Sequence, residues 1–465
     1  MAQPATISPT VSDDTARRQD LAARFDGRAP RYTSYPTAVQ FTPAVDAPTY
    51  RGWLAALPPA EAVSLYVHVP LCARLCWYCG CNTRAVNRRE PVSRYVEDLA
   101  LELGLLETAL PGKLRARALH LGGGTPNMLS PDDLARLFAA LRHAFEFSPD
   151  IEVAAELDPA VLTRDWVVAA AQHGLNRASL GVQDLSPIVQ AAVNRIEPFE
   201  VIERAVGWLR EVGVLSINLD LMYGLPRQTT ADVLNTLRQV LTLRPERLAL
   251  FGYAHVPWMK SHQQLIEDAA LPGPVERLDQ SEAAADFLAS EGYVRIGLDH
   301  YALPSDEMAI AQAAGRLHRN FQGYTTDAAG TLIGIGASSI GRLPQGFVQN
   351  QTAELSWRKA LEAGDLPIAR GVALTPDDHF RGEIIERLMC DLTVDLAAIC
   401  ARHGRQTGDL AGAVASLAPL AAEGLVRMTP TGLTVTQAGR PVLRSVCAAF
   451  DSYLDPSAQR HSKAI

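Results

Sequence analysis

The sequence predicts an α/β protein: a partial TIM-type (β/α) barrel of about six βα units, preceded by a lid segment and followed by a mostly helical, winged-helix-like domain. Three observations support this. The 465 residues are 48% hydrophobic and 20% charged, which is globular composition and enough chain for about three domains. Strand and helix patterns alternate from residue 62 to residue 301, which favours parallel strands joined by right-handed crossovers. The alternation stops after residue 354.

The alternating segment contains apolar runs separated by helical repeats with recognisable starts and stops. Residues 130–133, Ser-Pro-Asp-Asp, combine an N-cap serine, a proline in the first turn and two acids at the positive helix end. The predicted strands are 63–69, 118–121, 151–157, 177–182, 215–223 and 247–253, with a further strand at 294–301. The predicted helices are 92–110, one from 130, 163–173, 198–212, 230–243, and a long one that ends at 292.

Changes in pattern divide the chain into three predicted parts. Residues 1–55 form an extension that is polar up to about residue 50 and carries RYTSYP at 31–36, a segment whose two tyrosines suggest a lid over the barrel mouth. Residues 56–350 form the barrel. Residues 355–465 form the winged-helix-like domain, with a Thr-Pro-Asp-Asp helix start and two short strands around a Thr-Pro-Thr-Gly turn. Because residues 371–465 hold nine Lys or Arg and ten Asp or Glu, we expect a lid or docking role rather than DNA binding.

Charge and hydropathy disfavour several other classes of protein. The formal net charge is −8 and the pI is near 5.8, so a dominant nucleic-acid-binding surface is not expected. The first ten residues lack the basic and apolar regions of a secretory signal. The longest weakly polar run, 410–422, has thirteen residues and is too short to span a bilayer. We therefore expect a cytoplasmic monomer that binds neither nucleic acid nor membrane.

Four of the seven cysteines fall within ten residues, in the pattern C-x3-C-x2-C-x-C: Cys72, Cys76, Cys79 and Cys81. Such clustering indicates metal or redox chemistry rather than disulfides. Three thiolates can bind three irons of a [4Fe–4S] cube and leave the fourth iron open for a small chelating ligand. A structural zinc site usually needs a second ligand pair, and none is evident; a four-ligand electron-transfer cluster is the other alternative. The remaining cysteines are predicted to be small core residues: Cys390, Cys400 and Cys447.

Polar and glycine residues come after the predicted strands, at the carboxyl ends where barrels carry their chemistry. The cysteines follow the first strand, glycines 122–124 follow the second, Glu156 ends the third and Gln183 follows the fourth. Glycines at such a turn let the backbone approach a ligand closely, or simply permit a tight turn. A carboxylate there accepts hydrogen bonds from ribose hydroxyls or an amino group, or caps the next helix.

Several strings of residues together resemble a known family. C-x3-C-x2-C with an aromatic residue before the third cysteine is similar to the radical S-adenosylmethionine (SAM) superfamily. Within it, the chain resembles the oxygen-independent coproporphyrinogen III oxidases from residue 31 to the C-terminal CAAFDSYL. Val69, Leu71 and Tyr78 depart mildly from the family pattern and leave the cluster assignment intact. The strings are YVHVPLCARLCWYCGCNT, HLGGGTP, AAELDP, GVQD, NRIEPFE, INLDLMYGLP, YAHVP and HRNFQGYTT.

The resemblance implies a role for each matching residue. The cluster ligands would be Cys72, Cys76 and Cys79, with Cys81 nearby but not a ligand. The first SAM, on the open iron, would be contacted by Tyr66, Gly123, Glu156 and Ile340. The second SAM site would be lined by Tyr78, Gly124, Thr125, Gln183, Arg195, Asp220 and Ala254. The catalytic centre would contain Tyr66, His68 and Glu156.

Some of these residues also have purely structural interpretations. Period-two alternation places His68 on the same strand face as Tyr66, but a core histidine with satisfied hydrogen bonds fits the same position. Arg195 suits bidentate binding of a carboxylate, or it is an ordinary surface arginine. Asp220 caps a helix or binds a ligand, and Tyr78 packs over the cluster or contacts SAM.

The resemblance implies an oxidative decarboxylation in haem biosynthesis, from coproporphyrinogen III to protoporphyrinogen IX. A 5′-deoxyadenosyl radical, made from SAM at the [4Fe–4S] cluster, would take hydrogen from two propionate β-carbons, and each propionate would lose CO2 to become a vinyl group. A flavodoxin- or ferredoxin-type donor would supply electrons and an unknown acceptor would remove the last one. Because the substrate carries four carboxylates, arginines should face its cavity, with Arg31 and Arg319 as candidates.

Two other functions stay open. A haem-binding chaperone of the same superfamily would bind its ligand without decarboxylating it. Such relatives usually lack the CxC ending of the cysteine motif and the RYTSYP segment, and both are present here. A zinc-stabilised regulator that uses the winged-helix-like tail is disfavoured by charge and by the single cysteine cluster.

Overall fold

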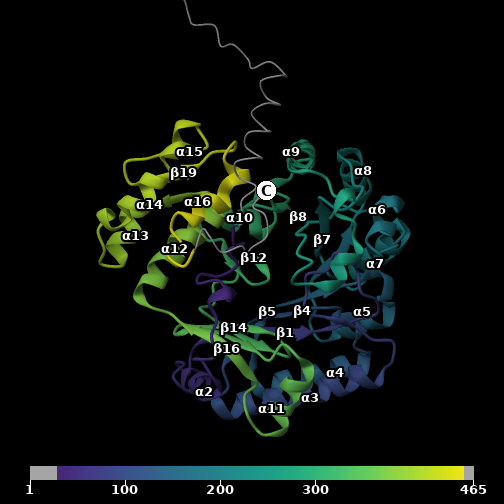
Figure 1. The fold of residues 1–465 in the computed structure, drawn as a ribbon. Coiled ribbons are helices and arrows are strands. Elements are labelled where there is room, and N and C mark those ends of the chain that lie inside the picture. The colour runs from purple at the N-terminus through teal and green to yellow at the C-terminus, as the bar shows by residue number, and fades with distance from the viewer. Residues whose placement is uncertain (1–28, 455–465) are drawn as a thin grey trace, which may run out of the picture.

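The computed structural model describes residues 29–454, and its main feature is a twelve-stranded sheet that curves through the molecule (Figure 1). Six strands lie in parallel and in chain order, as the alternating pattern predicted. These strands are β1 (Ala62–Val69), β4 (Arg115–Gly123), β5 (Glu146–Leu157), β6 (Arg177–Gln183), β7 (Ser216–Tyr223) and β8 (Arg247–Gly252). The helices after them are α3 (Glu90–Ala109), α4 (Pro131–Ala144), α5 (Arg164–Gln172), α7 (Phe199–Glu211), α8 (Thr230–Leu241) and α9 (Pro274–Ser290).

Further strands extend the sheet beside β1. β13 (Thr331–Ile335) runs parallel to β1, and β14 (Ile340–Leu343), β15 (Gly346–Asn350) and β16 (Ile368–Ala373) continue the sheet with antiparallel pairing. The sequence pattern did not predict these four strands. These strands extend the sheet to residue 373, beyond residue 350, where the sequence predicted the end of the barrel.

The opposite edge of the sheet is a hairpin. β10 (His300–Ala302) pairs antiparallel with β8 and with β9 (Val294–Ile296). The prediction of one strand over 294–301 is wrong, because the chain reverses at Gly297, where φ is +52°. β9 and β16 are the two edges, so the sheet is open.

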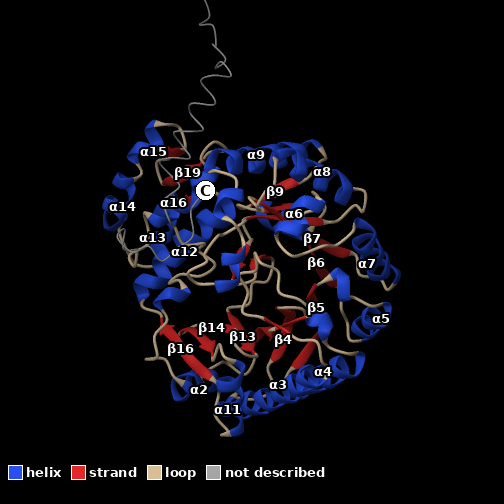
Figure 2. Cartoon of the chain, turned by 45° about the vertical axis from the view of Figure 1, so that its right-hand side comes forward, coloured by secondary structure: helices blue, strands red, loops and turns tan. Residues whose placement is uncertain are grey.

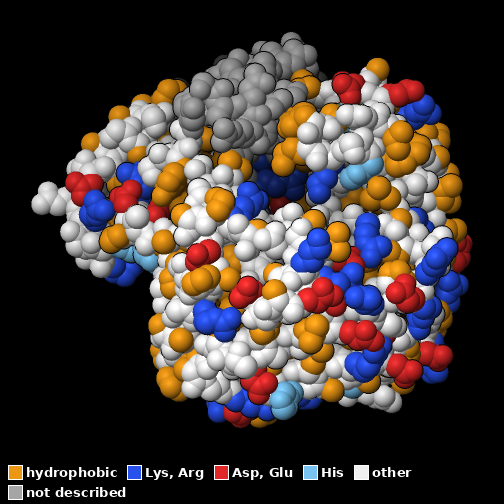
Figure 3. All heavy atoms as spheres, turned by 60° about the horizontal axis from the view of Figure 1, so that its bottom comes forward, with side chains coloured by type: hydrophobic (Ala, Val, Ile, Leu, Met, Phe, Trp, Pro, Cys, Tyr) orange, Lys and Arg blue, Asp and Glu red, His pale blue; other side chains and the backbone are white. Residues whose placement is uncertain are grey.

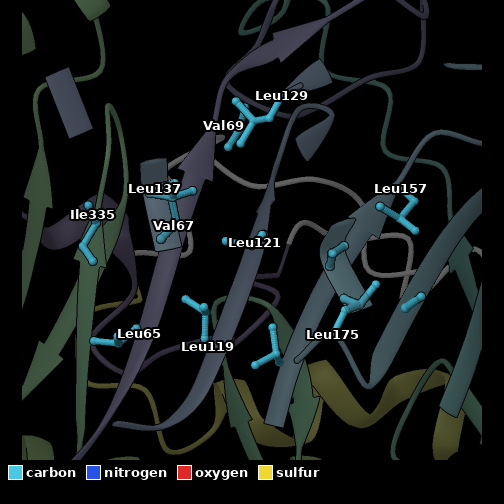
Figure 4. Close-up of a cluster of buried hydrophobic side chains, with 14 of the residues drawn as sticks. Leu65, Val67, Val69, Leu119, Leu121, Leu129, Leu137, Leu157, Leu175 and Ile335 are labelled. Carbon is cyan, nitrogen blue, oxygen red and sulfur yellow. The ribbon is translucent and has the colours of Figure 1, made fainter. Parts of the chain in front are cut away.

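The parallel strands have two different faces. Along β1, alternate side chains Val63, Leu65, Val67 and Val69 are fully buried and belong to the main core (Figure 4). Helices cover this face from outside (Figure 2). The residues between them, which include Tyr66 and His68, therefore face the inside of the curve, so the same alternation builds the core and orients the polar site.

A buried carboxylate joins α3 to the turn after β13. Glu102 accepts hydrogen bonds from Gly336 N–H at 2.7 Å, Asn350 Nδ2 at 2.6 Å and Trp357 Nε1 at 3.0 Å. Burial raises the pKa of Glu102 to about 7.

Replacing Glu102 with glutamine should change how stability depends on pH. The folded-state pKa lies above the unfolded value, so this group's contribution is fully present below about pH 4.5 and is lost as pH rises through 7, by on the order of 3 kcal/mol in total. Denaturant unfolding at pH 5 and pH 8 should therefore show a larger loss for wild type than for Glu102→Gln. Exposed Glu203→Gln should behave as wild type. Identical pH slopes for wild type and Glu102→Gln would contradict the expectation.

The segment before β1 packs onto the rest of the molecule. Although the sequence is aperiodic there, α2 (Ala47–Ala55) begins at Asp46, whose side chain accepts a hydrogen bond from Thr49 N–H, and it buries Tyr50 and Leu54 in the main core.

The C-terminal part has its own core and a three-stranded sheet. Thr375 and Asp378 form a capping box at the predicted helix start. The helices are α12 (Pro376–Asp391), α13 (Leu396–Arg402), α14 (Ala411–Ser416), α15 (Ala418–Ala422) and α16 (Leu443–Ala448). The strands, in sheet order, are β17 (Thr393–Asp395), β19 (Gly432–Val435) and β18 (Val426–Met428). The prediction that Cys390, Cys400 and Cys447 are buried is confirmed.

The other elements are short connections. They are β2 (Leu71–Cys72), β3 (Arg84–Ala85), α6 (Pro187–Ala192), α10 (Glu307–Ala313), β11 (His318–Asn320), β12 (Gly323–Thr325) and α11 (Glu354–Glu362). The 3-10 helices are η1 (Ala38–Gln40), η2 (Pro126–Met128), η3 (Pro159–Val161), η4 (Ser261–Leu265), η5 (Asp268–Ala270), η6 (Thr407–Leu410) and η7 (Arg440–Val442). Within residues 29–454, every helix is too short or too polar to cross a membrane.

Candidate functional site

The cysteine loop, residues 72–81, leaves the sheet just after β1. β2 and β3 pair in parallel and close the loop at its base, where Val86 N–H donates to Cys72 O at 2.8 Å. The loop therefore starts at the carboxyl edge of the parallel strands, next to the glycines that end β4.

Each predicted ligand thiol lies beside a hydrogen-bond donor. The pairs are Thr125 Oγ1 with Cys72 Sγ at 3.3 Å, Arg195 Nη1 with Cys76 Sγ at 3.7 Å, and Cys81 N with Cys79 Sγ at 3.4 Å. Two hydrogen bonds from Cys81, first the one from its side chain and then the one from its backbone N–H, lower the pKa of the Cys79 thiol. Within residues 29–454, no three acidic, His or Cys side chains are placed to hold a single ion. A [4Fe–4S] cube is larger and takes each thiolate on a different iron, and three thiols that accept hydrogen bonds on one loop fit such a cluster.

Tyr66 and His68 lie next to each other on the inner face of β1. His68 Nε2 is 3.0 Å from Asn82 O, and a carbonyl oxygen only accepts, so Nε2 carries the proton. Nδ1 then accepts a hydrogen bond from the Tyr66 hydroxyl at 2.9 Å. Burial lowers the pKa of His68, which keeps the ring neutral. Both ring nitrogens are satisfied by protein groups, so a catalytic role for His68 stays a prediction.

Glu156 near the end of β5 is held by two donors. His120 Nε2 lies 3.0 Å from Oε1, and Gly123 N–H donates to Oε2 at 3.0 Å. Burial acts to raise the pKa of Glu156, but His120 and Gly123 outweigh it and hold the pKa below its ordinary value. The Tyr66 ring stacks on His120 at a centroid distance of 5.9 Å. An ionised carboxylate with a fixed orientation therefore faces the inside of the sheet beside Tyr66.

His120 was missed in the sequence, although a signal for it was present. It is the one polar residue of the predicted strand 118–121, two positions before Gly122, so both residues share a strand face. The same inward face supplies Glu156 from the neighbouring strand. A polar side chain at an inward-facing position of a parallel strand was therefore the signal that could have identified His120.

The glycines after β4 are required mainly by contacts within the protein. A Cβ at Gly122 would lie 2.9 Å from Glu156 Oε1, and a Cβ at Gly123, where φ is +106°, would lie 2.6 Å from the His68 ring. At Gly124 the Cβ would lie 2.9 Å from the Leu71 backbone. From the sequence, we expected these glycines to let a ligand approach the backbone. The structure shows that a Cβ at these positions would already clash with the protein's own atoms.

Replacing Gly123 with alanine should damage the site and the fold together. The positive φ and the contact with His68 should lower the free energy of unfolding by on the order of 1–3 kcal/mol. The matched control is Gly104→Ala on the exposed face of α3, where no atom lies within 4 Å of the added Cβ, and which should raise stability by about 0.5–1 kcal/mol. Denaturant unfolding checks both, and an unchanged midpoint for Gly123→Ala would contradict the account.

Arg195 is buried and is not an ordinary surface arginine. Its Nη2 donates to Gly181 O at 2.6 Å and lies 3.3 Å from Asp158 and 3.0 Å from Glu197. It thereby ties the thiol of Cys76 to the ends of β5 and β6. The buried Nε has no hydrogen-bond partner among residues 29–454, which leaves one donor for a ligand.

The other predicted residues lie at neighbouring strand ends. Gln183, at φ +66°, ends β6, and a Cβ on Gly181 would lie 2.9 Å from its Nε2 and 3.3 Å from Arg195 Nη2. Asp220 on β7 accepts from Ser179 Oγ at 2.7 Å and from Asn218 Nδ2 at 2.8 Å.

Tyr78 and Ala254 are linked by one side chain, while Ile340 lies on the other side of β1. Gln263 Nε2 donates to the backbone carbonyls of Tyr78 at 2.9 Å and Ala254 at 3.3 Å. Ile340 begins β14, two strands from β1, and its backbone lies beside Gly334 of β13, the residue that pairs with Tyr66.

Two cavities lie next to these residues, and the larger is bounded by β8, by α9 and by residues 437–444 of the C-terminal part. The smaller, of about 270 Å³, is lined by His120, Glu156 and Asp220. The larger, of about 1140 Å³, is lined by five arginines: Arg31, Arg277, Arg295, Arg319 and Arg444. Phe251 and Gln322 line both cavities, which therefore adjoin. A space-filling view shows the molecule hollowed, with Lys or Arg side chains inside the hollow (Figure 3).

The larger cavity, called here the arginine cavity, contains uncommitted donors. Arg319 is half-buried, and its buried Nε and Nη1 have no hydrogen-bond partner among residues 29–454, although its guanidinium lies 4.3 Å from the Tyr324 ring centroid. Burial acts to raise the pKa of Asp299, but His300, Arg319 and Arg31 lower it to about 2. Acidic side chains also line the cavity: Asp268, Glu282, Asp286 and Asp299.

Comparisons with known proteins match this chain over nearly its whole length. Sequence models of the radical SAM superfamily and of the HemN C-terminal domain match residues 66–240 and 374–442. An oxygen-independent coproporphyrinogen III oxidase from Bradyrhizobium diazoefficiens is 48% identical over 96% of this chain and 100% of the relative, and one from Escherichia coli is 38% identical over 96% and 98%.

A solved structure agrees with the sequence relatives. The coproporphyrinogen III oxidase HemN from Escherichia coli, described as a radical SAM enzyme, superposes with a TM-score of 0.87 and 39% identity, and covers 91% of this chain and 98% of its own. Its fold extends over the sheet and the C-terminal part alike. With the cysteine loop, the strand-end carboxylate and these relatives taken together, the chain belongs to the oxygen-independent coproporphyrinogen III oxidases of the radical SAM superfamily.

Proposed function

We propose that this chain oxidises coproporphyrinogen III to protoporphyrinogen IX without oxygen, converting two propionates to vinyl groups with loss of CO2. The arginine cavity carries this proposal. It offers five guanidinium groups to a substrate with four carboxylates. It also adjoins the smaller cavity, which is lined by Glu156 and His120. Guanidinium groups bind carboxylates through paired hydrogen bonds, and Arg319 has two buried donors free for one.

The cysteine loop would hold the cluster through Cys72, Cys76 and Cys79. When bound, the cluster and SAM supply the 5′-deoxyadenosyl radical that oxidises the substrate. The chain's own residues would orient SAM and shield the radical from water. Glu156, which His120 and Gly123 keep ionised, offers hydrogen-bond acceptors to hydroxyl or amino groups of SAM. Burial of the site excludes water that would quench a radical.

The two SAM sites are proposed from the residues that the sequence singled out. The first would be contacted by Tyr66, Gly123, Glu156 and Ile340. The second would be lined by Tyr78, Gly124, Thr125, Gln183, Arg195, Asp220 and Ala254. The free Nε of buried Arg195 and the satisfied carboxylate of Asp220 support the second site as a polar pocket.

The RYTSYP segment is proposed as a lid. Tyr32 Oη donates to Asp451 Oδ2 at 3.1 Å and Tyr35 Oη lies 2.9 Å from Ser452 Oγ, so both rings anchor on the end of the described chain. Arg31 and Thr33 meanwhile line the arginine cavity.

Removing residues 1–40 should lower turnover by about tenfold or more while the cluster spectrum survives, because Arg31 is lost and the cavity opens to water. Removing only residues 1–28 is the matched control and should leave turnover near wild type. Anaerobic product formation measures both, and full activity after the longer truncation would show that the segment is no lid.

The division of the chain into a barrel and a C-terminal domain is also part of this proposal. We take the open, curved parallel sheet as a partial barrel and the part with the β17–β19–β18 sheet as a winged-helix-like domain, divided near residue 373 where β16 ends. Cytoplasmic location, monomeric state and a flavodoxin- or ferredoxin-type electron donor stay predictions.

An anaerobic assay tests the function against the haem-binding chaperone. Reconstituted protein, SAM, a reductant and coproporphyrinogen III should yield protoporphyrinogen IX and 5′-deoxyadenosine. Chromatography detects both products. An intact cluster with stoichiometric haem binding and no vinyl product would favour the chaperone. The named relatives favour the oxidase.

A further inference from the structure

Asp299 and His300 are adjacent residues that face two different cavities. Asp299, just before β10, lines the arginine cavity, and His300, the first residue of β10, lines the smaller cavity together with Glu156. The ring of Phe251, which lines both cavities, packs edge-to-face against the His300 ring at a centroid distance of 5.5 Å. The two residues therefore lie in the wall where the cavities adjoin, and a substrate in the arginine cavity must pass His300 to reach Glu156.

One nitrogen of the His300 ring is committed and the other is not. Nδ1 lies 2.7 Å from Asp299 Oδ1. Asp299 is ionised because, although burial acts to raise its pKa, its neighbours hold the pKa at about 2, so Oδ1 accepts and Nδ1 carries a proton. Nε2 makes no hydrogen bond with any residue of the described chain, although the side chain is only 10% exposed. Because buried polar atoms are nearly always paired, the free Nε2 indicates a ligand.

The free end of the ring lies towards the arginine cavity. A Cβ on Gly323, which lines that cavity, would lie 3.6 Å from His300 Cε1 and 3.7 Å from Nε2. A substrate carboxylate that reaches Nε2 places the ring between two anions, since Asp299 already contacts Nδ1. Asp220 is a further acid near the ring, because His300 acts against the rise that burial causes in the Asp220 pKa. These charges favour an imidazolium that donates from both nitrogens once a carboxylate is bound.

We propose that His300 binds the carboxylate of the propionate that reacts, through one hydrogen bond from Nε2, while the arginine cavity binds the other carboxylates. This inference rests on the proposed function and assigns a residue to its substrate. The reacting carboxylate loses its negative charge when it leaves as CO2, and one hydrogen bond opposes that loss less than the paired bonds of a guanidinium. Asp299 acts as a positioning residue that fixes the ring. The hydrogen bond itself breaks no covalent bond and moves no electron; it holds the propionate β-carbon within reach of the radical.

Deuterated substrate reports directly where the β-carbon lies. With coproporphyrinogen III deuterated at the propionate β-carbons, His300→Leu should lower the fraction of 5′-deoxyadenosine that carries deuterium by about threefold or more, because a misplaced propionate lets the radical take hydrogen elsewhere. Vinyl groups formed per 5′-deoxyadenosine should fall by the same factor. His300→Gln keeps an N–H donor near the position of Nε2 and should restore part of this coupling. The matched control is His143→Leu on α4, where the histidine is 79% exposed, and it should behave as wild type.

Two comparisons show whether the effect passes through the pair of residues. Asp299→Asn should lower the deuterated fraction as well, and Asp299→Asn/His300→Leu should be no lower than His300→Leu alone, since both changes act on one hydrogen bond. Arg319→Met should raise KM yet leave the deuterated fraction at the wild-type value, because this arginine binds a carboxylate that does not react.

Binding measurements separate this role from a structural one. Without SAM, the Kd of the cluster-loaded enzyme for coproporphyrinogen III should rise about threefold to tenfold in His300→Leu, while its cluster spectrum and its Kd for SAM stay at the wild-type values. A wild-type deuterated fraction in His300→Leu would overturn the proposal. So would loss of the cluster or of SAM binding in both His300→Leu and His300→Gln, since the ring would then be part of the scaffold. If wild type itself transfers no deuterium to 5′-deoxyadenosine, the proposed function fails instead.

Discussion

Replacing Cys76 with alanine should abolish decarboxylation, with a loss of at least about a thousandfold, because the cluster would lose one of three ligands and no radical would form. The same variant should lose the visible absorption and iron content of the reconstituted cluster. Its fold should persist, since Cys76 contributes one thiol beside Arg195 and the loop keeps its backbone hydrogen bonds.

Cys81→Ala is the matched control on the same loop. The backbone N–H of residue 81 donates to Cys79 Sγ at 3.4 Å, and alanine retains this bond while it removes the hydrogen bond between the two cysteine side chains. This variant should keep its iron and most of its activity. Loss of the cluster in Cys81→Ala with retention in Cys76→Ala would show that the ligand assignment is wrong.

Replacing Arg319 with methionine should weaken substrate binding by about tenfold to a hundredfold in KM, while the cluster spectrum and SAM binding stay unchanged. A hydrogen-bonded charge pair contributes about 1.5–3 kcal/mol, and the buried Nε and Nη1 of Arg319 have no other hydrogen-bond partner among residues 29–454. Steady-state kinetics under anaerobic conditions give KM and kcat separately.

Two variants make the Arg319 result specific. Arg319→Lys keeps the charge but not the planar pair of donors, so its KM should lie between wild type and methionine. Arg427→Met on β18 removes an exposed arginine that does not line the cavity and should have no effect. An unchanged KM in Arg319→Met would remove this residue from the carboxylate-binding set.

The parallel part of the fold was predictable because its signals are local. β1, β6, β7 and β8 were expected within about one residue of their bounds, whereas the polar starts of β4 and β5 lie three and five residues before the predicted strands. The cysteine loop was predictable for the same reason, since its ligands fall within ten residues. Fully buried parallel strands and clustered thiols both show in a short window of sequence.

Features that depend on distant residues were not predictable. β13 completes the sheet next to β1 from more than 250 residues away, and nothing near residue 331 indicates that partner. The bond between Arg195 and Cys76 joins residues 119 apart, so burial of this arginine could not be read locally. α2 was missed because only two of its nine residues, Tyr50 and Leu54, are buried. The hairpin at 294–301 was missed because Gly297 was the only break in its pattern.

The central claim is that the arginine cavity presents a propionate of the substrate to chemistry at the Tyr66–Glu156 site. It is tested most directly with coproporphyrinogen III deuterated at the propionate β-carbons, incubated anaerobically with the reconstituted enzyme and SAM. Mass spectrometry should find deuterium in 5′-deoxyadenosine, with one such molecule for each vinyl group formed. 5′-Deoxyadenosine that carries no deuterium, alongside unconverted substrate, would contradict the account.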